Sequence, residues 1–159
     1  MNMILDELAA SLPNAQEAVR VIIRLLAALL AGGIIGLQRE ASGKAAGLRT
    51  HMLVCAGTTL FVLAAIDAGM AQDALSRVIQ GLVTGIGFLG AGAILKVESS
   101  HQIKGLTTAA GVWMTAALGV AIGLGQLGTA AIGTVLAWFV LAVLIGIDRR
   151  IDGSDPDRA

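Results

Sequence analysis

The chain has 159 residues, of which 56% are hydrophobic and 14% charged, and its mean hydropathy is +0.82. A water-soluble domain of this size could not bury so much apolar surface, and a net charge of zero spread over short clusters excludes a nucleic-acid-binding protein. Because one membrane crossing needs about 20 helical residues, the length allows four to six crossings and leaves no room for a separate soluble domain.

The first 18 residues contain acidic but no basic side chains, so they lack the basic start of a signal peptide and are expected to form a lead-in segment. The charge-free runs that follow predict five membrane-spanning helices, the last two separated by a glycine-rich turn. We therefore expect an all-α membrane protein, a bundle of about five transmembrane helices. The predicted transmembrane domain covers residues 19–147, with spans at 19–37, 51–66, 78–95, 105–123 and 129–147, and residues 148–159 form a tail.

Lysine and arginine are distributed unequally between the two sides of such a bundle. The first and third loops and the tail hold eight of them, whereas the opposite side holds Arg77, or three residues if Arg20 and Arg24 are included. Because positively charged loops stay cytoplasmic, the N-terminus is predicted outside and the C-terminus in the cytoplasm. Arg24 is an intramembrane charge, for which Asp67 and Asp73 are the expected partners; outward snorkelling is the alternative.

Glycine is abundant, at 21 residues, and many glycines have spacings that allow helices to pack closely in a bilayer. The letters GxGxxG at residues 85–90 match a nucleotide loop, but they lie inside a predicted span with no strand before them, so we interpret them as a packing surface. Packing within the chain and a homodimer are both compatible with this pattern. The expected packing residues are Gly32, Gly36, Gly81, Gly85, Gly87, Gly90, Gly92, Gly119 and Gly123.

Polar residues converge at the two predicted cytoplasmic loops. Each loop re-enters the membrane with Gly-Leu-X-Thr, so Thr50 and Thr108 are expected to cap new helices beside a basic residue, a geometry that suits an anionic group. The alternative is that these residues only cap helices and hold the loops at the headgroups, and that His51 is an interfacial residue rather than a pH sensor. The candidate functional cluster comprises Gln38, Arg39, Glu40, Arg49, Thr50, His51, Lys104, Gly105, Thr107 and Thr108.

Enzyme chemistry has no support in the sequence. It contains neither HExxH nor GxSxG, and its single cysteine, Cys55, excludes an intramolecular disulfide. We therefore expect no enzyme and no cofactor. The predicted spans contain no Asp or Glu, the side chains that Mg²⁺ prefers, so we also expect no bound metal. Threonines within the spans leave an alternative function open, a small oligomeric transporter or channel for an ion or solute.

Four segments resemble the MgtC/SapB family of bacterial inner-membrane proteins, namely GLQRE at 36–40, AGLRTHMLV at 46–54, GIGFLGAGAIL at 85–95 and GLTTAAGVW at 105–113. They follow the family's order over residues 24–124. The resemblance implies a multi-pass inner-membrane protein linked to magnesium limitation, acid stress and survival inside host phagocytes. It also implies a regulator that acts through another membrane complex, which for the best-known member is the F-type ATP synthase, rather than a bulk magnesium transporter.

Two features depart from the usual pattern of that family. Gln38 stands where the family usually has glutamate, which removes a cytoplasmic carboxylate. Many members continue into a soluble ACT-like C-terminal domain, whereas this sequence ends at Ala159, so functions of that domain are not carried over. The family's motif residues fall on the candidate functional cluster, which favours a functional interpretation of it.

Overall fold

The computed structural model describes residues 14–97 and 102–152, so part of the predicted lead-in and of the predicted tail lies outside the described residues. The described residues form five helices and one short hairpin. Four of the helices are long and apolar enough to cross a membrane, and the fifth is apolar over Leu127–Val143. The predicted all-α membrane bundle is thus confirmed. The helices are α2 (Ala15–Ala41), α3 (Leu48–Asp67), α4 (Gln72–Gly92), α5 (Leu106–Gly123) and α6 (Leu127–Asp152), and the strands are β1 (Leu95–Val97) and β2 (Gln102–Lys104).

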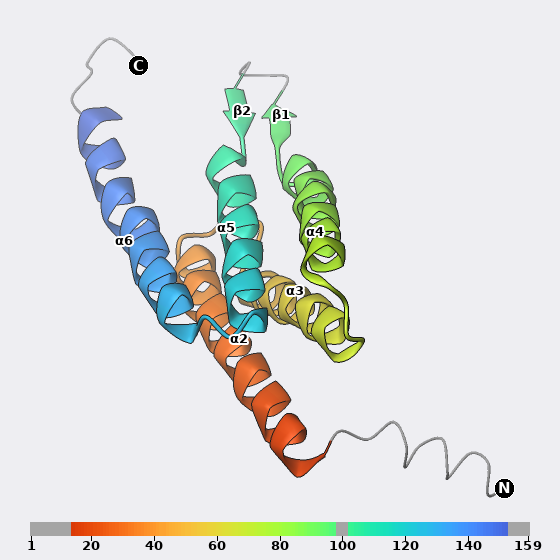
Figure 1. Ribbon diagram of the computed structural model, residues 1–159. Helices are drawn as coiled ribbons and strands as arrows, with labels where there is room; N and C mark the ends of the chain where they lie inside the picture. Colours follow the sequence, from red (N-terminus) through yellow and green to blue (C-terminus); the bar gives the residue numbers. More distant parts are fainter. Residues whose placement is uncertain (1–13, 98–101, 153–159) are drawn as a thin grey trace, which may run out of the picture.

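Successive helices run in opposite directions, so their connections lie alternately at the two ends of the bundle (Figure 1). The α2–α3 loop, the β1–β2 hairpin and the end of α6 lie at one end, which we call the hairpin end. The start of α2 and the α3–α4 and α5–α6 turns lie at the opposite end. This alternation places both loops of the candidate functional cluster at the hairpin end.

The hairpin replaces the end of the predicted third span. The sequence predicts that span to reach residue 95, whereas α4 ends at Gly92 and Leu95 pairs with Lys104. Glycine is a poor helix former, and both Gly90 and Gly92 occur in the last turn of α4, which favours ending the helix there. Two short antiparallel strands then return the chain to the bundle.

Helix α5 lies at the centre of the bundle, where it contacts α2, α3, α4 and α6. Nine of its residues are buried, whereas only Ile86 and Gly90 are buried in α4. Of helices α2 to α5, α4 is therefore the most exposed to lipid. The main core is built from small and branched apolar side chains, namely Ala28, Ala31, Ile35, Cys55, Leu118, Ile122, Ala130 and Leu141.

Four glycines allow α2 and α5 to lie directly against α3. A Cβ atom at Gly32 would lie 2.5 Å from a backbone oxygen of α3, and one at Gly36 would lie 2.7 Å from a backbone carbon. A Cβ atom at Gly119 or Gly123 would overlap side chains of α3. Small residues allow this close approach in a bilayer, where helix association depends on packing rather than on exclusion of water. These glycines therefore serve packing within one chain.

The predicted packing glycines of α4 have a different environment. Gly90 faces α5, where a Cβ atom would make an ordinary contact, 3.6 Å from Cβ of Ala109. A Cβ atom added at any of the other four would meet no neighbouring atom within 4 Å, although two of them have the same GxxxG spacing as the buried pairs: Gly81, Gly85, Gly87 and Gly92. The spacing thus occurs both inside the bundle and on its surface.

Candidate functional site

The last turn of α2 is tied to three other helices through three consecutive side chains. Gln38 donates to the Leu141 carbonyl oxygen of α6, and Arg39 donates to the Thr108 hydroxyl of α5. The Glu40 carboxylate accepts from the Leu48 N–H of α3. Each of these three hydrogen bonds is 2.8 Å long. Consecutive helical residues point about 100° apart, so the three can reach different neighbours. The GLQRE segment therefore joins the helices at the hairpin end.

Arg39 is fully buried, with 0% of its surface exposed. Its Nη2 atom donates to Oγ1 of Thr108 at 2.8 Å, but its Nε and Nη1 atoms have no hydrogen-bond partner among the described residues. Thr108 lies in the first turn of α5, whose first backbone hydrogen bond runs from Ala109 N to Gly105 O, so the free N–H groups and positive dipole end of that helix lie nearby. Arg39 is thus a buried cation beside a positive helix end.

His51 is also fully buried and lies against the same face of α5. Its Nδ1 atom is 2.9 Å from the carbonyl oxygen of Gly47, and because a carbonyl only accepts, Nδ1 carries the hydrogen. Its Nε2 atom has no hydrogen-bond partner among the described residues. A Cβ atom added at Gly111 of α5 would lie 3.5 Å from this Nε2 atom. Gly111 follows Thr108 by one helical turn, so Arg39 and His51 approach α5 side by side. We call Arg39, His51 and Thr108 the polar junction.

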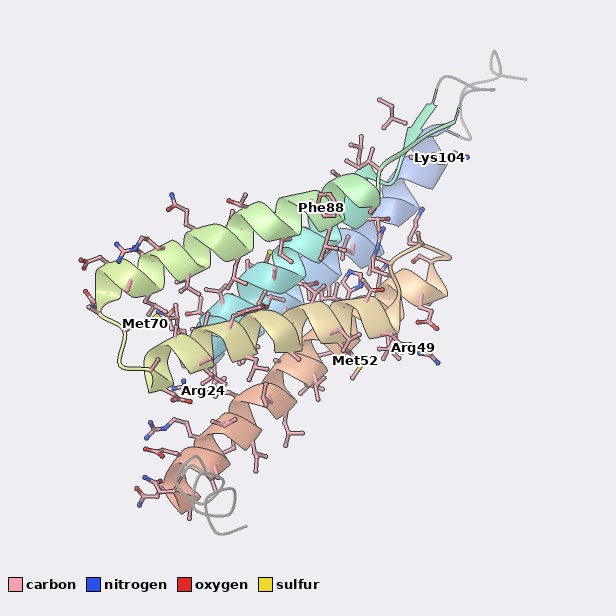
Figure 2. The ribbon with its side chains drawn as sticks, turned by 90° about the vertical axis from the view of Figure 1, so that its right-hand side faces the viewer. Arg24, Arg49, Met52, Met70, Phe88 and Lys104 are labelled. Carbon is pink, nitrogen blue, oxygen red and sulfur yellow. The ribbon has the colours of Figure 1, made fainter. Side chains whose placement is uncertain are left out.

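The other members of the candidate functional cluster lie outside the junction, with Gln38 and Gly105 half-buried and the rest on the surface. Arg49, Thr50, Lys104 and Thr107 are exposed. Figure 2 shows Arg49 and Lys104 at the hairpin end and Arg24 and Met70 at the opposite end. An open polar groove of about 480 Å³ is lined by Glu40, Lys44, Ala45, Gly47, Leu48, Arg49 and Thr50. The structure therefore divides the predicted cluster into a buried part and an exposed part.

The predicted threonine caps are wrong. The N-cap residues are Gly47 for α3 and Gly105 for α5, and neither helix start has a side-chain cap hydrogen bond from its N-cap residue. Each helix begins two residues before the threonine, which therefore lies inside the first turn. Gly105 has φ 97°, and a Cβ atom there would overlap the carbonyl oxygen of Ala93, so this position needs glycine.

Arg24 has a different partner from the two carboxylates that the sequence suggests. Its Nη1 atom donates to the carbonyl oxygen of Gly123 at 2.8 Å, and its guanidinium packs against Gly125, which has φ 83°. The last carbonyls of a helix carry partial negative charge, which a cation stabilises. The predicted pairing with Asp67 or Asp73 is therefore wrong, since the end of α5 supplies the acceptor.

The outer face of α4 carries a stripe of small and polar residues. Gln80, Thr84, Gly87 and Ala91 recur every three or four residues, which places them on one side of the helix, and all four are exposed. The Thr84 hydroxyl donates to the carbonyl oxygen of Gln80 at 3.0 Å. A separate apolar groove of about 610 Å³ between α3 and α4 includes Gly81 and Gly85 in its lining. We call the four exposed residues the α4 stripe.

Three groups at the site were not singled out from the sequence. They are the Gly47 carbonyl that accepts from His51, Gly111 beside the imidazole ring, and the Leu141 carbonyl that accepts from Gln38. Two are backbone atoms, which carry no sequence signal. Gly111 belongs to the GLTTAAGVW segment, and its spacing of one turn from Thr108 was the available clue. In residues 14–97 and 102–152, no group of three or more His, Cys, Asp or Glu could hold a metal ion.

Comparison with known proteins places the junction inside a matched region. The sequence model of the MgtC family matches residues 25–150. The chain is 46% identical over 137 residues to Protein SrpB of Synechococcus elongatus, covering 79% of this chain and 74% of that protein. It is 44% identical over 139 residues to Escherichia coli YhiD, described as a putative magnesium transporter. That match covers 82% of this chain and 63% of YhiD. It is 41% identical over 115 residues to Protein MgtC of Salmonella typhimurium, a match that covers 72% of this chain and 48% of that protein. No solved structure matches.

Proposed function

The chain belongs to the MgtC family, and from this premise we propose that it is a non-catalytic regulator of the bacterial inner membrane that acts by contacting another membrane protein complex. The observation that carries the proposal is the α4 stripe. Gln80 and Thr84 lie near the middle of α4, where the side-chain amide of glutamine would face hydrocarbon. Polar and small residues of this kind join transmembrane helices in lipid. The stripe is therefore proposed to contact a transmembrane helix of the partner.

The environment of α4 supports the same conclusion. It has fewer buried residues than α2, α3 or α5, so its outer surface is free for lateral contact. Phe88, next to Gly87 on this helix, is 81% exposed. A glycine beside a protruding aromatic side chain gives a surface with a recess and a ridge, which suits a helix of complementary shape.

The partner and the physiological setting are carried over from the resemblance to the MgtC/SapB family. The membrane-embedded part of the F-type ATP synthase is the first candidate partner, and magnesium limitation, acid stress and intracellular survival are the proposed conditions of action. With the N-terminus outside, as the lysine and arginine count indicates, the polar junction lies at the cytoplasmic side. The surface available to a cytoplasmic part of the partner is then the polar groove beside Arg49.

Affinity capture tests the proposal. The tagged chain is cross-linked in its native membrane after growth with low and with high magnesium, and captured proteins are identified by mass spectrometry. We expect a membrane complex in defined stoichiometry, with capture largely lost when Gly87→Leu fills the recess of the stripe. Gly128→Leu is the matched control, because Gly128 is an exposed helical glycine of α6 with no neighbour within 4 Å.

Each outcome distinguishes the regulator from other functions. Capture of ATP synthase subunits that depends on Gly87 would identify the partner. Capture of the chain alone, as a homodimer through the stripe, would contradict the regulator. Equal capture by Gly87→Leu and Gly128→Leu would show that the stripe is not the contact surface.

A transporter is the second candidate, because a relative with 44% identity carries the description of a putative magnesium transporter. Five of the threonines that could line a path donate to backbone carbonyls, which favours the regulator. Flux of Mg²⁺ or another ion into liposomes that contain the folded protein would support the transporter. The engaged hydroxyls belong to Thr58, Thr59, Thr84, Thr115 and Thr134.

A further inference from the structure

The buried guanidinium of Arg39 lacks a counter-ion among the described residues. Its Nε and Nη1 atoms carry three N–H bonds, and none of these has an acceptor there. An arginine side chain stays protonated, so burial cannot remove its charge by loss of a proton. A buried charge is stable when it is paired and its hydrogen bonds are made. The arrangement therefore calls for an anion.

The charged side chains that the structure describes around the junction do not supply that anion. On α2, the Glu40 carboxylate accepts from the Leu48 N–H at the start of α3. On α3, Arg49 is exposed and positive, and Lys104 on β2 is likewise exposed. Helix α5 has no charged residue between Leu106 and Gly123, and the described side chains of α6 up to Val143 are uncharged. The positive end of the α5 dipole adds to the charge of Arg39.

His51 determines which anion fits. Because its Nδ1–H donates to Gly47, a neutral ring presents a lone pair at Nε2, and only a protonated ring presents a second N–H. Arg39 bonds to Thr108, and the His51 ring lies beside Gly111 one turn later, so both side chains approach the same face of α5. A carboxylate between them would accept from Arg39 through one oxygen and would need a donor at Nε2 for the other.

We propose that the polar junction is a binding site for a small carboxylate, held by Arg39 and His51, and that binding is coupled to the uptake of one proton by His51. The proton comes from bulk water and is bound at Nε2, so the imidazolium and the guanidinium each donate to the carboxylate. The proposal does not depend on the α4 stripe, so either can fail without the other. It makes the hairpin end responsive to both an anion and pH.

Formate is the probe, because it is the smallest carboxylate. The purified full chain in detergent is heated in HEPES buffer with and without sodium formate, at several values between about pH 6 and about pH 8, where an imidazole titrates. We expect formate to raise the unfolding midpoint. We also expect its apparent affinity to increase as the pH falls, by up to about tenfold per pH unit for one coupled proton.

Three variants make the result decisive. Arg39→Met removes the charge and should abolish the formate response. His51→Gln places a permanent amide donor near the position of Nε2 and should keep the response but remove its pH dependence. Arg20→Met, an exposed arginine of the same helix at the opposite end, is the matched control and should behave as the wild type.

A purely structural junction gives a different pattern. In that case formate leaves the wild-type midpoint unchanged at every pH, while Arg39→Met lowers the midpoint through loss of the Thr108 hydrogen bond. This pattern would overturn the proposal. A formate response of equal size in Arg39→Met would overturn it as well. A response that requires Arg39 but does not vary with pH would refute the coupling to His51.

Discussion

Replacing Gly32 by alanine tests how closely α2 and α3 must approach. The new Cβ atom would lie 2.5 Å from the His51 carbonyl oxygen and 2.9 Å from two further backbone carbons of α3. Ordinary van der Waals contact begins near 3.4 Å, so the two helices would have to separate by almost an ångström. No side chain can rotate away to relieve this contact, because all three atoms belong to the backbone.

The magnitude follows from two opposing terms. Overpacking costs about 1 to 3 kcal/mol, and contact with backbone places this site at the upper end of that range. Alanine is a better helix former than glycine by about 1 kcal/mol, which offsets part of the loss. We therefore expect Gly32→Ala to lower the free energy of unfolding by about 2 kcal/mol.

The assay is reversible unfolding in mixed micelles with increasing sodium dodecyl sulfate, followed by circular dichroism. Gly85→Ala is the control, since Gly85 shares the GxxxG spacing but has no neighbour within 4 Å. The control should be neutral or more stable by up to about 1 kcal/mol. If Gly32→Ala is as stable as Gly85→Ala, the close approach of α2 and α3 does not exist as described.

Two further substitutions address single hydrogen bonds. Glu40→Gln replaces a charged acceptor of the Leu48 N–H by a neutral one. We expect the free energy of unfolding to fall by about 1 kcal/mol and hydrogen exchange in the first turn of α3 to become faster. Unchanged exchange would refute the bond. Arg24→Leu removes the donor to the Gly123 carbonyl. We expect the free energy of unfolding to fall by about 1 to 2 kcal/mol, whereas the control Arg20→Leu should not change it. Equal stability of the two variants would contradict the contact.

The number of helices could be predicted because charge and hydropathy along the chain reflect the thickness of a bilayer. The direction of individual side chains could not. Gly32/Gly36 and Gly81/Gly85 have the same spacing, yet a Cβ atom added to the first pair would collide with α3, whereas one added to the second would meet nothing within 4 Å. Which pair is buried depends on how neighbouring helices cross, and sequence spacing does not specify that.

At the candidate site, too, the sequence predicts which segments meet but not which side chains are buried. Arg39 and Arg49 both belong to motif segments near one predicted loop, and the sequence gives no reason to separate them. Arg39 is nevertheless fully buried, whereas Arg49 is exposed. The difference arises because α2 continues to Ala41, so that Arg39 is still helical and faces α5, while Arg49 lies in the first turn of α3 on the outer side. Helix ends, which sequence patterns locate poorly, therefore decided the composition of the junction.

The bond between Gln38 and Leu141 has a consequence for biogenesis. Its two residues are 103 positions apart, so α2 enters the bilayer long before the ribosome has made its partner. Until α6 is inserted, the Gln38 amide has only Ser42 to bond, at 3.2 Å, and an intermediate lacking the last helix exposes a polar group at the hairpin end. This bond can therefore close only after α6 has been inserted beside α2, which makes it a marker of the arrival of that helix in the bundle.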